Sequence, residues 1–203
     1  FILSIFFLAL VFTGTATAKT TFISIGTGGT GGVYYPYGGG VAEIWSKNVK
    51  GVRAVAEVTG ASVENVKLAH KGETVIGEVM ADSVIAGYEG LSKFKGKKHD
   101  ILSMAIMYPN VLQVVTLKKS GITNIEQVKG RNISTGSPGS GTNFMTEAVF
   151  KALGIPLDSY KDSRLSFTES ANALRDGTIE VGIWCVGPPT SSIMDLSTTH
   201  DIS

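Results

Sequence analysis

The chain has 203 residues, of which 43% are hydrophobic and 17% are charged, and its 18 basic and 17 acidic side chains leave a formal net charge of +1. The hydrophobic fraction excludes a disordered or collagen-like chain. The balanced charge argues against nucleic-acid binding, which needs a concentrated basic surface. The length allows one large domain or two small ones, each with its own core.

Residues 1–18 have the features of a secretory signal. An apolar run from Phe1 to Phe12 is too short to span a bilayer, and Ala16-Thr17-Ala18 after it forms an A-x-A cleavage pattern. The run begins without a charged segment or a start methionine, so we expect residues 1–18 to be a partial signal peptide and the mature chain to start near Lys19, in the periplasm. A buried helix or a membrane anchor is the alternative. Cys185 is the single cysteine, so the fold has no internal disulfide.

From Thr21 the chain alternates short apolar runs with amphipathic stretches. The expected order is a strand at 22–26, a helix through 41–45, a strand at 53–58, a helix from Ser62 to the C′ glycine Gly72, a strand at 74–79 and a helix over 82–88. This β-α-β-α-β order predicts a parallel sheet covered by helices. The apolar segments 101–108 and 111–117, separated by Pro109-Asn110, predict a pair of strands or one bent strand.

A polar segment after Leu117 predicts a boundary near Lys118, with lobe 1 over 19–118 and lobe 2 over 119–203. The second lobe repeats the first: strands are expected at 131–135, 165–167 and 179–186, and helices at 142–153 and 168–176. A repeated sequence pattern supports two similar halves. The segments Gly72–Gly77 and Gly177–Gly182 share a helix-cap, strand and glycine layout, although glycine at a helix C′ position is common.

The first glycine cluster, Gly26–Gly32, follows the first predicted strand and precedes the first helix. Glycines allow close backbone approach to a ligand, and a helix start offers free N–H groups to an anion. Gly26, Gly28 and Gly31 also satisfy G-x-G-x-x-G, with Glu57 as a candidate ribose-binding acid, so a dinucleotide site and a simple packing turn are alternatives. Gly38-Gly39-Gly40 inside the first helix indicates close backbone approach or an irregular first turn, and Tyr34 or Tyr35 could line a pocket.

The second glycine cluster, Gly136–Thr142, is again a strand-to-helix turn. Its serine and threonine hydroxyls and the free amides of the helix start could bind a carboxylate even though the cluster has no arginine. A serine hydrolase is the enzymatic alternative, but no G-x-S-x-G sequence is present. The three histidines lie far apart, and their spacing suggests neither a triad nor a metal site. Two anion-binding loops at the carboxyl ends of strands predict a ligand cleft between two lobes.

Five segments together resemble the solute-binding subunits of tripartite ATP-independent periplasmic (TRAP) transporters, in the TAXI branch. They are IGTGGTGGVYYPYGG (25–39), VTGASVENVKLAHKGE (58–73), ADSVIAGYEG (81–90), GSPGSGT (136–142) and RLSFTESANALRDG (164–177). The resemblance implies an α/β, two-lobed periplasmic binding protein fold of type II-like topology. Members of that family continue further and return to the first lobe, so the resemblance also implies that lobe 2 is incomplete at Ser203.

The resemblance further implies a non-enzymatic protein without cofactor or metal. It would capture a small carboxylate, glutamate-like or a dicarboxylate, and deliver it to a sodium-coupled TRAP permease. The implied ligand-binding residues are Thr27, Gly28, Thr30, Tyr34, Tyr35, Asp82, Ser137, Gly139, Ser140, Gly141, Thr142 and Trp184. Met80-Ala81 replaces a polar pair of the family, and Trp184–Pro189 replaces its usual strand end. A secreted enzyme and a dinucleotide-binding domain are the alternatives.

Overall fold

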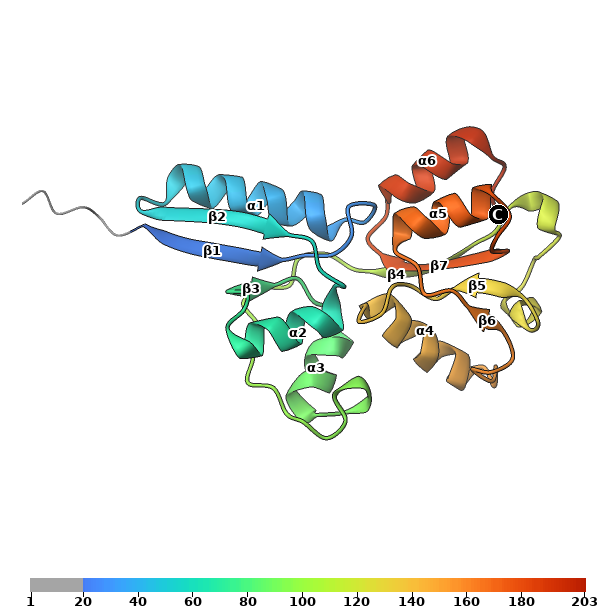
Figure 1. Ribbon diagram of the computed structural model, residues 1–203, viewed down its shortest axis with the longest axis horizontal. Coiled ribbons are helices and arrows are strands. Elements are labelled where there is room, and N and C mark those ends of the chain that lie inside the picture. The colour runs from blue at the N-terminus through green and yellow to red at the C-terminus, as the bar shows by residue number, and fades with distance from the viewer. Residues whose placement is uncertain (1–19) are drawn as a thin grey trace, which may run out of the picture.

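The structure, a computed structural model, describes residues 20–203 and contains two separate β-sheets, each with its own helices (Figure 1). The predicted signal peptide lies outside the described residues. The first sheet has the order β2-β1-β3 and is parallel throughout. Its elements are β1 (Thr21–Gly26), α1 (Tyr34–Asn48), β2 (Val52–Glu57), α2 (Ser62–Lys71), β3 (Ile76–Gly77) and α3 (Ala81–Glu89). We call these elements the first lobe, and they confirm the predicted β-α-β-α-β order.

The second sheet has the order β4-β7-β5-β6, in which β4 runs antiparallel to β7 and the other pairs are parallel. Its strands are β4 (Val111–Val115), β5 (Asn132–Ser134), β6 (Lys161–Asp162) and β7 (Val181–Val186), and its helices are α4 (Gly141–Ala152), α5 (Phe167–Arg175) and α6 (Ser191–Thr199). These elements form the second lobe. Short 3-10 helices are η1 (Ser92–Phe94), η2 (Lys118–Ser120) and η3 (Ile125–Val128).

The two lobes contain the same arrangement of strands and helices, in line with the repeated pattern of segments Gly72–Gly77 and Gly177–Gly182. The order β2-β1-β3 in the first sheet corresponds to β6-β5-β7 in the second. Helices α2 and α5 each end before a left-handed glycine, Gly72 or Gly177, with φ of 73° at both positions. The strand that follows each helix places a second glycine against the central strand, where Gly77 pairs with Gly26 and Gly182 pairs with Ser134.

Two predicted strands are wrong. Segment 101–108 has no strand partner in the part of the chain that the structure describes, and Leu102 and Ile106 are 95% and 97% exposed. An apolar, β-branched run becomes a strand only where a neighbouring strand takes its hydrogen bonds. Segment 165–167 is also not a strand, because β6 lies earlier and Ser166 caps α5.

Helix α6 was not predicted, because its sequence is rich in serine and threonine, which are weak helix formers. Tertiary contacts stabilise it instead: Leu196 is fully buried, and the Trp184 indole N–H donates to the Ser192 hydroxyl at 3.1 Å. The boundary expected near Lys118 stays a prediction. The structure adds that β4, which lies just before that point, already pairs with β7 of the second sheet.

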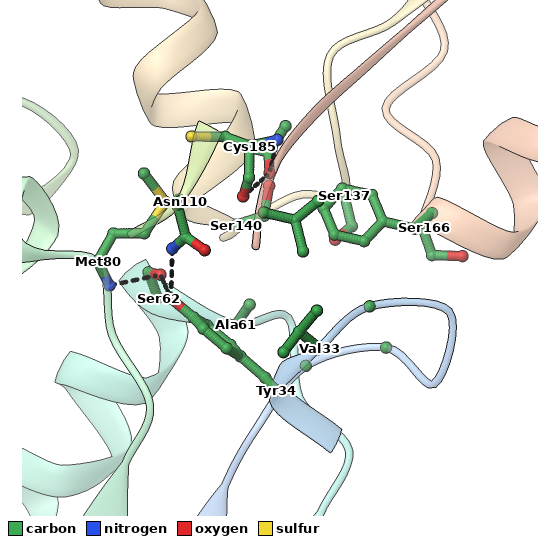
Figure 2. Close-up of a pocket in the computed structure, with 17 residues that line it drawn as sticks. Val33, Tyr34, Ala61, Ser62, Met80, Asn110, Ser137, Ser140, Ser166 and Cys185 are labelled. Atoms are coloured by element: carbon green, nitrogen blue, oxygen red, sulfur yellow. Dashed lines mark hydrogen bonds between the residues drawn. The ribbon is translucent and has the colours of Figure 1, made fainter. Parts of the chain in front are cut away.

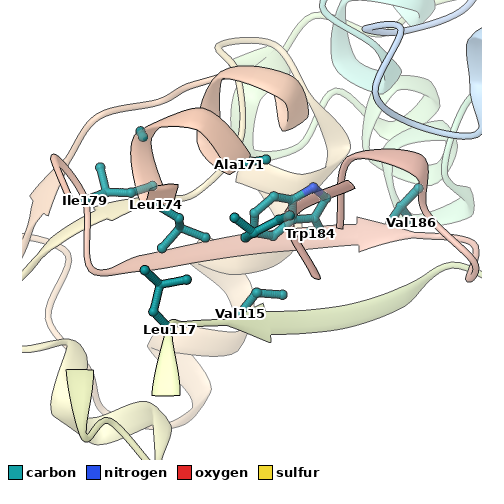
Figure 3. Packing of buried hydrophobic residues seen from close by; sticks show 9 residues of the cluster. Val115, Leu117, Ala171, Leu174, Ile179, Trp184 and Val186 are labelled. Carbon is teal, nitrogen blue, oxygen red and sulfur yellow. The ribbon is translucent and has the colours of Figure 1, made fainter. Parts of the chain in front are cut away.

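Strand β7 is buried along its whole length because the second lobe covers it on both faces. One face carries Trp184, which packs with Leu174 of α5, Leu196 of α6 and Val115 of β4 (Figure 3). The other face carries Ile183, in a cluster with Phe150 and Ile133. A strand covered on both faces reads as a continuous apolar run, which explains why the sequence located it.

The three consecutive glycines of α1 differ in surroundings, and this difference predicts opposite mutational effects. A Cβ on Gly38 would lie 2.6 Å from Thr27 Cγ2 and 2.7 Å from Glu78 Oε1, whereas Cβ atoms on Gly39 and Gly40 would meet nothing within 4 Å. We expect Gly38→Ala to destabilise by about 1–3 kcal/mol through overpacking. Gly39→Ala and Gly40→Ala should each stabilise by about 0.5–1 kcal/mol. Denaturant melts of the three variants test this, and equal effects would contradict it.

Candidate functional site

A small cavity of about 40 Å³ lies between the two lobes, where the carboxyl ends of the central strands face each other (Figure 2). The residues around it come from both lobes and from the segment that joins them. They are Gly28, Gly29, Gly32, Val33, Tyr34, Ala61, Ser62, Met80, Asn110, Ser137, Ser140, Gly141, Thr142, Ser166, Phe167, Cys185 and Val186.

The amino ends of five helices converge on this cavity. The residue that immediately precedes each helix is Val33 for α1, Ala61 for α2, Met80 for α3, Ser140 for α4 and Ser166 for α5, and all five line the cavity. Each helix start carries unsatisfied N–H groups and a partial positive charge. The lining contains no ionisable side chain apart from Tyr34 and Cys185 among the described residues. The cavity therefore favours negative charge through backbone dipoles alone.

Local sequence explains how the two helices of the second lobe begin. The Ser140 hydroxyl accepts the Asn143 N–H at 3.1 Å. Ser166 and Glu169 form a reciprocal capping box, in which the Ser166 hydroxyl accepts the Glu169 N–H and the Glu169 carboxylate accepts the Ser166 N–H. Both caps leave their serine at the cavity wall.

In the first lobe, α2 begins without a side-chain cap, and the other lobe supplies the missing acceptor. Val63 N–H and Glu64 N–H donate to the Gly139 carbonyl at 3.0 and 3.2 Å. The Gly31 carbonyl in turn accepts the Ser191 hydroxyl at 3.2 Å. These bonds hold the glycine loop of each lobe against the opposite lobe, which accounts for the small volume of the cavity.

Polar side chains form one side of the cavity. The Ser62 hydroxyl accepts the Met80 N–H at 3.1 Å and lies 3.5 Å from the Tyr34 hydroxyl. Asn110 Nδ2 donates to the same tyrosine at 3.4 Å, and its buried Oδ1 makes no hydrogen bond to any described residue (Figure 2). Asn110 therefore presents a free acceptor beside the cavity.

Burial keeps the two ionisable side chains of the cavity lining, Tyr34 and Cys185, neutral at physiological pH. It raises the pKa of the Tyr34 hydroxyl, and it raises the pKa of the Cys185 thiol to about 11, with a further contribution from the nearby charge of Asp82. The pKa of Asp82 is itself raised by burial. Because the thiol is protonated at neutral pH, it is a weak hydrogen-bond donor here rather than a nucleophile.

Half of the predicted site residues line the cavity. They are Gly28, Tyr34, Ser137, Ser140, Gly141 and Thr142. The Thr142 hydroxyl is engaged by the backbone of Cys185, whose N–H it accepts at 3.2 Å, so it is less available to a ligand than expected. The Ser137 hydroxyl makes no hydrogen bond to another described residue, and Ser140 keeps its hydroxyl proton free to donate.

The other six predicted residues do not line the cavity. Thr27 is fully buried and its hydroxyl donates to the Glu57 carbonyl, and Thr30 and Tyr35 face solvent. Asp82 Oδ1 accepts the N–H of the next residue, Ser83, at 2.7 Å. The Gly139 carbonyl caps α2. Trp184 lies in the core, where its ring stacks on that of Phe167 with the ring centroids 5.9 Å apart. Trp184 thus supports a lining residue without reaching the cavity.

Sequence reasoning missed Ser62, Asn110, Ser166 and Phe167 as lining residues. Serine is a typical N-cap residue, but Ala61 holds that position in α2 and Ser62 is the first residue of the helix. The spacing Ser166-x-x-Glu169 is a capping-box pattern and could have revealed the start of α5. Asn110 had no local signal, because the connection between the lobes brings it to the site.

A second, larger cavity of about 990 Å³ lies beside the first sheet, between β3 and segment 101–107, and its walls are mostly apolar. Glu78 at its edge is 4% exposed, and its Oε2 makes no hydrogen bond within the described chain. Burial raises the pKa of this carboxyl to about 8. This cavity does not have the converging helix starts of the first.

Two further findings bear on function. His99 and His70 are distant in sequence but adjacent in the fold: His99 is 9% exposed, and its ring centroid lies 4.8 Å from that of His70. Across residues 20–203 no group of three histidine, cysteine or acidic side chains is placed to hold a metal ion. None of the helices in that range has the length and apolar character needed to cross a bilayer.

Comparison with protein families gives a match over residues 25–203 to the NMT1-like family. The chain belongs to this family. The matched range contains every described element except the first residues of β1, so both glycine loops and all cavity residues lie within it.

Solved structures share the fold at low sequence identity. The alkanesulfonate-binding protein SsuA from Xanthomonas axonopodis pv. citri, bound to MOPS, is 13% identical over 91% of this chain and 61% of its own, with a TM-score of 0.58. A putative L-cystine ABC transporter from Listeria monocytogenes is 13% identical over 91% and 76%, with a TM-score of 0.62. The periplasmic aliphatic sulphonate binding protein SsuA from Escherichia coli is 12% identical over 90% and 55%, with a TM-score of 0.54.

These matches confirm the predicted fold class, a two-lobed periplasmic binding protein fold. The chain spans 61% and 55% of the length of the two sulfonate-binding proteins. The three matched proteins are named as binding proteins or a transporter, and none is named as an enzyme. The TAXI branch and the TRAP permease stay predictions.

The buried Glu78 carboxyl should make stability depend on pH. Its pKa is about 8 in the folded protein against an ordinary value of 4.5, so between these values the folded chain binds more protons than the unfolded chain. The free energy of unfolding therefore falls as pH rises through this window. Glu78→Gln cannot ionise, so the melting temperature of the wild type should fall by roughly 5 °C or more relative to this variant between pH 5 and 8. Parallel pH curves for the two proteins would contradict the expectation.

Proposed function

We propose that the protein is a periplasmic solute-binding protein that closes its two lobes over a small carboxylate and passes it to a membrane permease. The observation that carries this proposal is the convergence of five helix amino ends on one cavity that has no basic side chain among its lining residues. Helix starts bind anions through their free N–H groups and their dipoles. The family and the fold support a binding role rather than catalysis.

The proposed ligand contacts are divided between the lobes. Ser137 and Ser140 would donate hydroxyl protons to the carboxylate, beside the free amides at the start of α4. The backbone at Gly28 and Gly29 would approach from the first lobe. Phe167, with the neighbouring apolar side chains of both lobes, would contact the carbon skeleton of the solute.

The finer assignment follows the five segments that resemble the TAXI branch of TRAP transporters. We propose a glutamate-like or dicarboxylate solute and a sodium-coupled TRAP permease as the membrane partner. Uptake into vesicles that contain the permease should then require a sodium gradient and continue without ATP. Uptake that requires ATP would instead favour an ABC partner, as named for the Listeria protein.

The solute can be identified by thermal shift with a defined panel. The panel contains L-glutamate, succinate, 2-oxoglutarate, acetate, ethanesulfonate, L-cystine and L-arginine. We expect a carboxylate to raise the melting temperature with saturation, because a ligand that binds only the folded state stabilises it by mass action. A shift with ethanesulfonate alone would replace the carboxylate by a sulfonate, and a shift with L-arginine alone would contradict an anion site.

Ser137→Ala tests the proposed contact, because this hydroxyl has no partner to lose within the described structure. For the best carboxylate of the panel we expect the dissociation constant to rise about 10- to 100-fold, the range for a lost hydrogen bond to a charged group, without a change in melting temperature. Ser163→Ala is the matched control, since Ser163 is exposed and lies outside the cavity lining. Unchanged affinity of Ser137→Ala by calorimetry would remove this residue from the site.

A further inference from the structure

We propose that Asn65 is a positioning residue that holds the three loops of the first lobe in place at the ligand cavity. The inference rests on the proposed function only for its binding consequence. Asn65 lies on α2, is fully buried and does not line the cavity between the lobes. Any effect on a ligand must therefore act through the backbone that it contacts.

The Asn65 amide group joins the ends of two strands. Its Nδ2 lies 3.0 and 2.7 Å from the carbonyl oxygens of Gly26 and Thr27 and 2.8 Å from that of Glu78, so its two N–H groups donate to three carbonyls and one N–H is shared between two of them. The first two carbonyls lie where β1 ends, and the third lies just after β3. One side chain thus links three backbone carbonyls, of which the Gly26 carbonyl also accepts the Glu78 N–H and the Thr27 carbonyl also lies 2.9 Å from the Thr59 hydroxyl.

The Asn65 carbonyl oxygen joins the third strand end. Its Oδ1 accepts the Thr59 hydroxyl at 2.7 Å, and Thr59 Oγ1 in turn accepts the Ala61 N–H at 3.0 Å. Both residues belong to the loop between β2 and α2. Asn65 is therefore bonded to the loops that follow all three strands of the first sheet.

Two glycines leave the space that the Asn65 side chain occupies between β1 and β3. Gly26 and Gly77 pair with each other across β1 and β3. A Cβ on Gly26 would lie 2.9 Å from Asn65 Oδ1, and a Cβ on Gly77 would lie 3.0 Å from Asn65 Cβ. An aspartate of the same shape has no N–H to donate and would direct negative charge at three carbonyls. The site thus requires a group that both donates and accepts.

Each loop that Asn65 holds contributes cavity residues. Gly28 and Gly29 follow β1, Ala61 and Ser62 follow β2, and Met80 follows β3. Loosening the three strand ends would misplace these residues together, and a ligand bound by converging dipoles is sensitive to such displacement. In the second lobe, Ser170 lies at the equivalent position of α5, seven residues before the helix-ending glycine, and donates to Ser134.

The test is amide hydrogen exchange without ligand on Asn65→Asp and Thr59→Val, with Ser170→Ala as the matched control from the other lobe. Useful reporters are the Thr27 and Glu78 amides, which are bonded to the Glu57 and Gly26 carbonyls. We expect Asn65→Asp to speed exchange at both by at least about 10-fold, and Thr59→Val to do so more weakly. Exchange at Ser163, bonded to Ile133, should change only in Ser170→Ala.

Unchanged exchange at Thr27 and Glu78 in both first-lobe variants would overturn the inference, as would an equal increase at Val52, at the far end of the same sheet. If Asn65→Asp does not fold, the Glu78 amide of Thr59→Val decides the question, because the Thr59 hydroxyl lies 2.9 Å from the Thr27 carbonyl and its loss acts on that loop directly. The binding readout uses L-glutamate. If glutamate binds the wild type, we expect its dissociation constant to be at least about 10-fold higher for Asn65→Asp and unchanged for Ser163→Ala, a substitution at an exposed residue outside the cavity lining. Absence of glutamate binding to the wild type contradicts that choice of solute, while the exchange experiment still decides the role of Asn65.

Discussion

The site depends on one constraint of parallel strand-to-helix connections: the carboxyl end of a strand and the amino end of the next helix meet at the same edge of the sheet. Each lobe repeats this connection, so each places helix starts along a single edge. Because the two edges face each other, five partial positive charges surround one small volume. The backbone thus gives the cavity its anion-binding character, and the described lining needs no arginine or lysine for it.

Close contact between the lobes depends on residues without side chains. A Cβ on Gly31 would lie 2.4 Å from Thr168 Oγ1, and one on Gly141 would lie 2.6 Å from Met80 Sδ and 2.7 Å from Ser62 Oγ. The glycine clusters therefore allow the lobes to touch as well as a ligand to approach. This explains why Gly139 supplies a cap for α2 instead of lining the cavity.

The acidic side chains of the first lobe do not line the cavity. Glu78, with its pKa raised to about 8 by burial, lies next to Gly38 and borders the larger apolar cavity rather than the space between the lobes. The described cavity lining is consequently neutral at physiological pH, and a carboxylate there meets no negative side chain in direct contact. Polar recognition is left to hydroxyls, amides and the free oxygen of Asn110.

Sequence alone determined the features that rest on local chemistry: the order of helices and strands through β3, the left-handed glycines Gly72 and Gly177, and the two glycine loops. These follow from hydrophobic periodicity and from backbone conformations that only glycine adopts easily. Tertiary structure decided which residues meet, because segments distant in the chain supply Asn110, Cys185 and the cap of α2. It also decided that segment 101–108 is not a strand, because a strand needs a neighbouring strand to pair with, and the local sequence does not specify one.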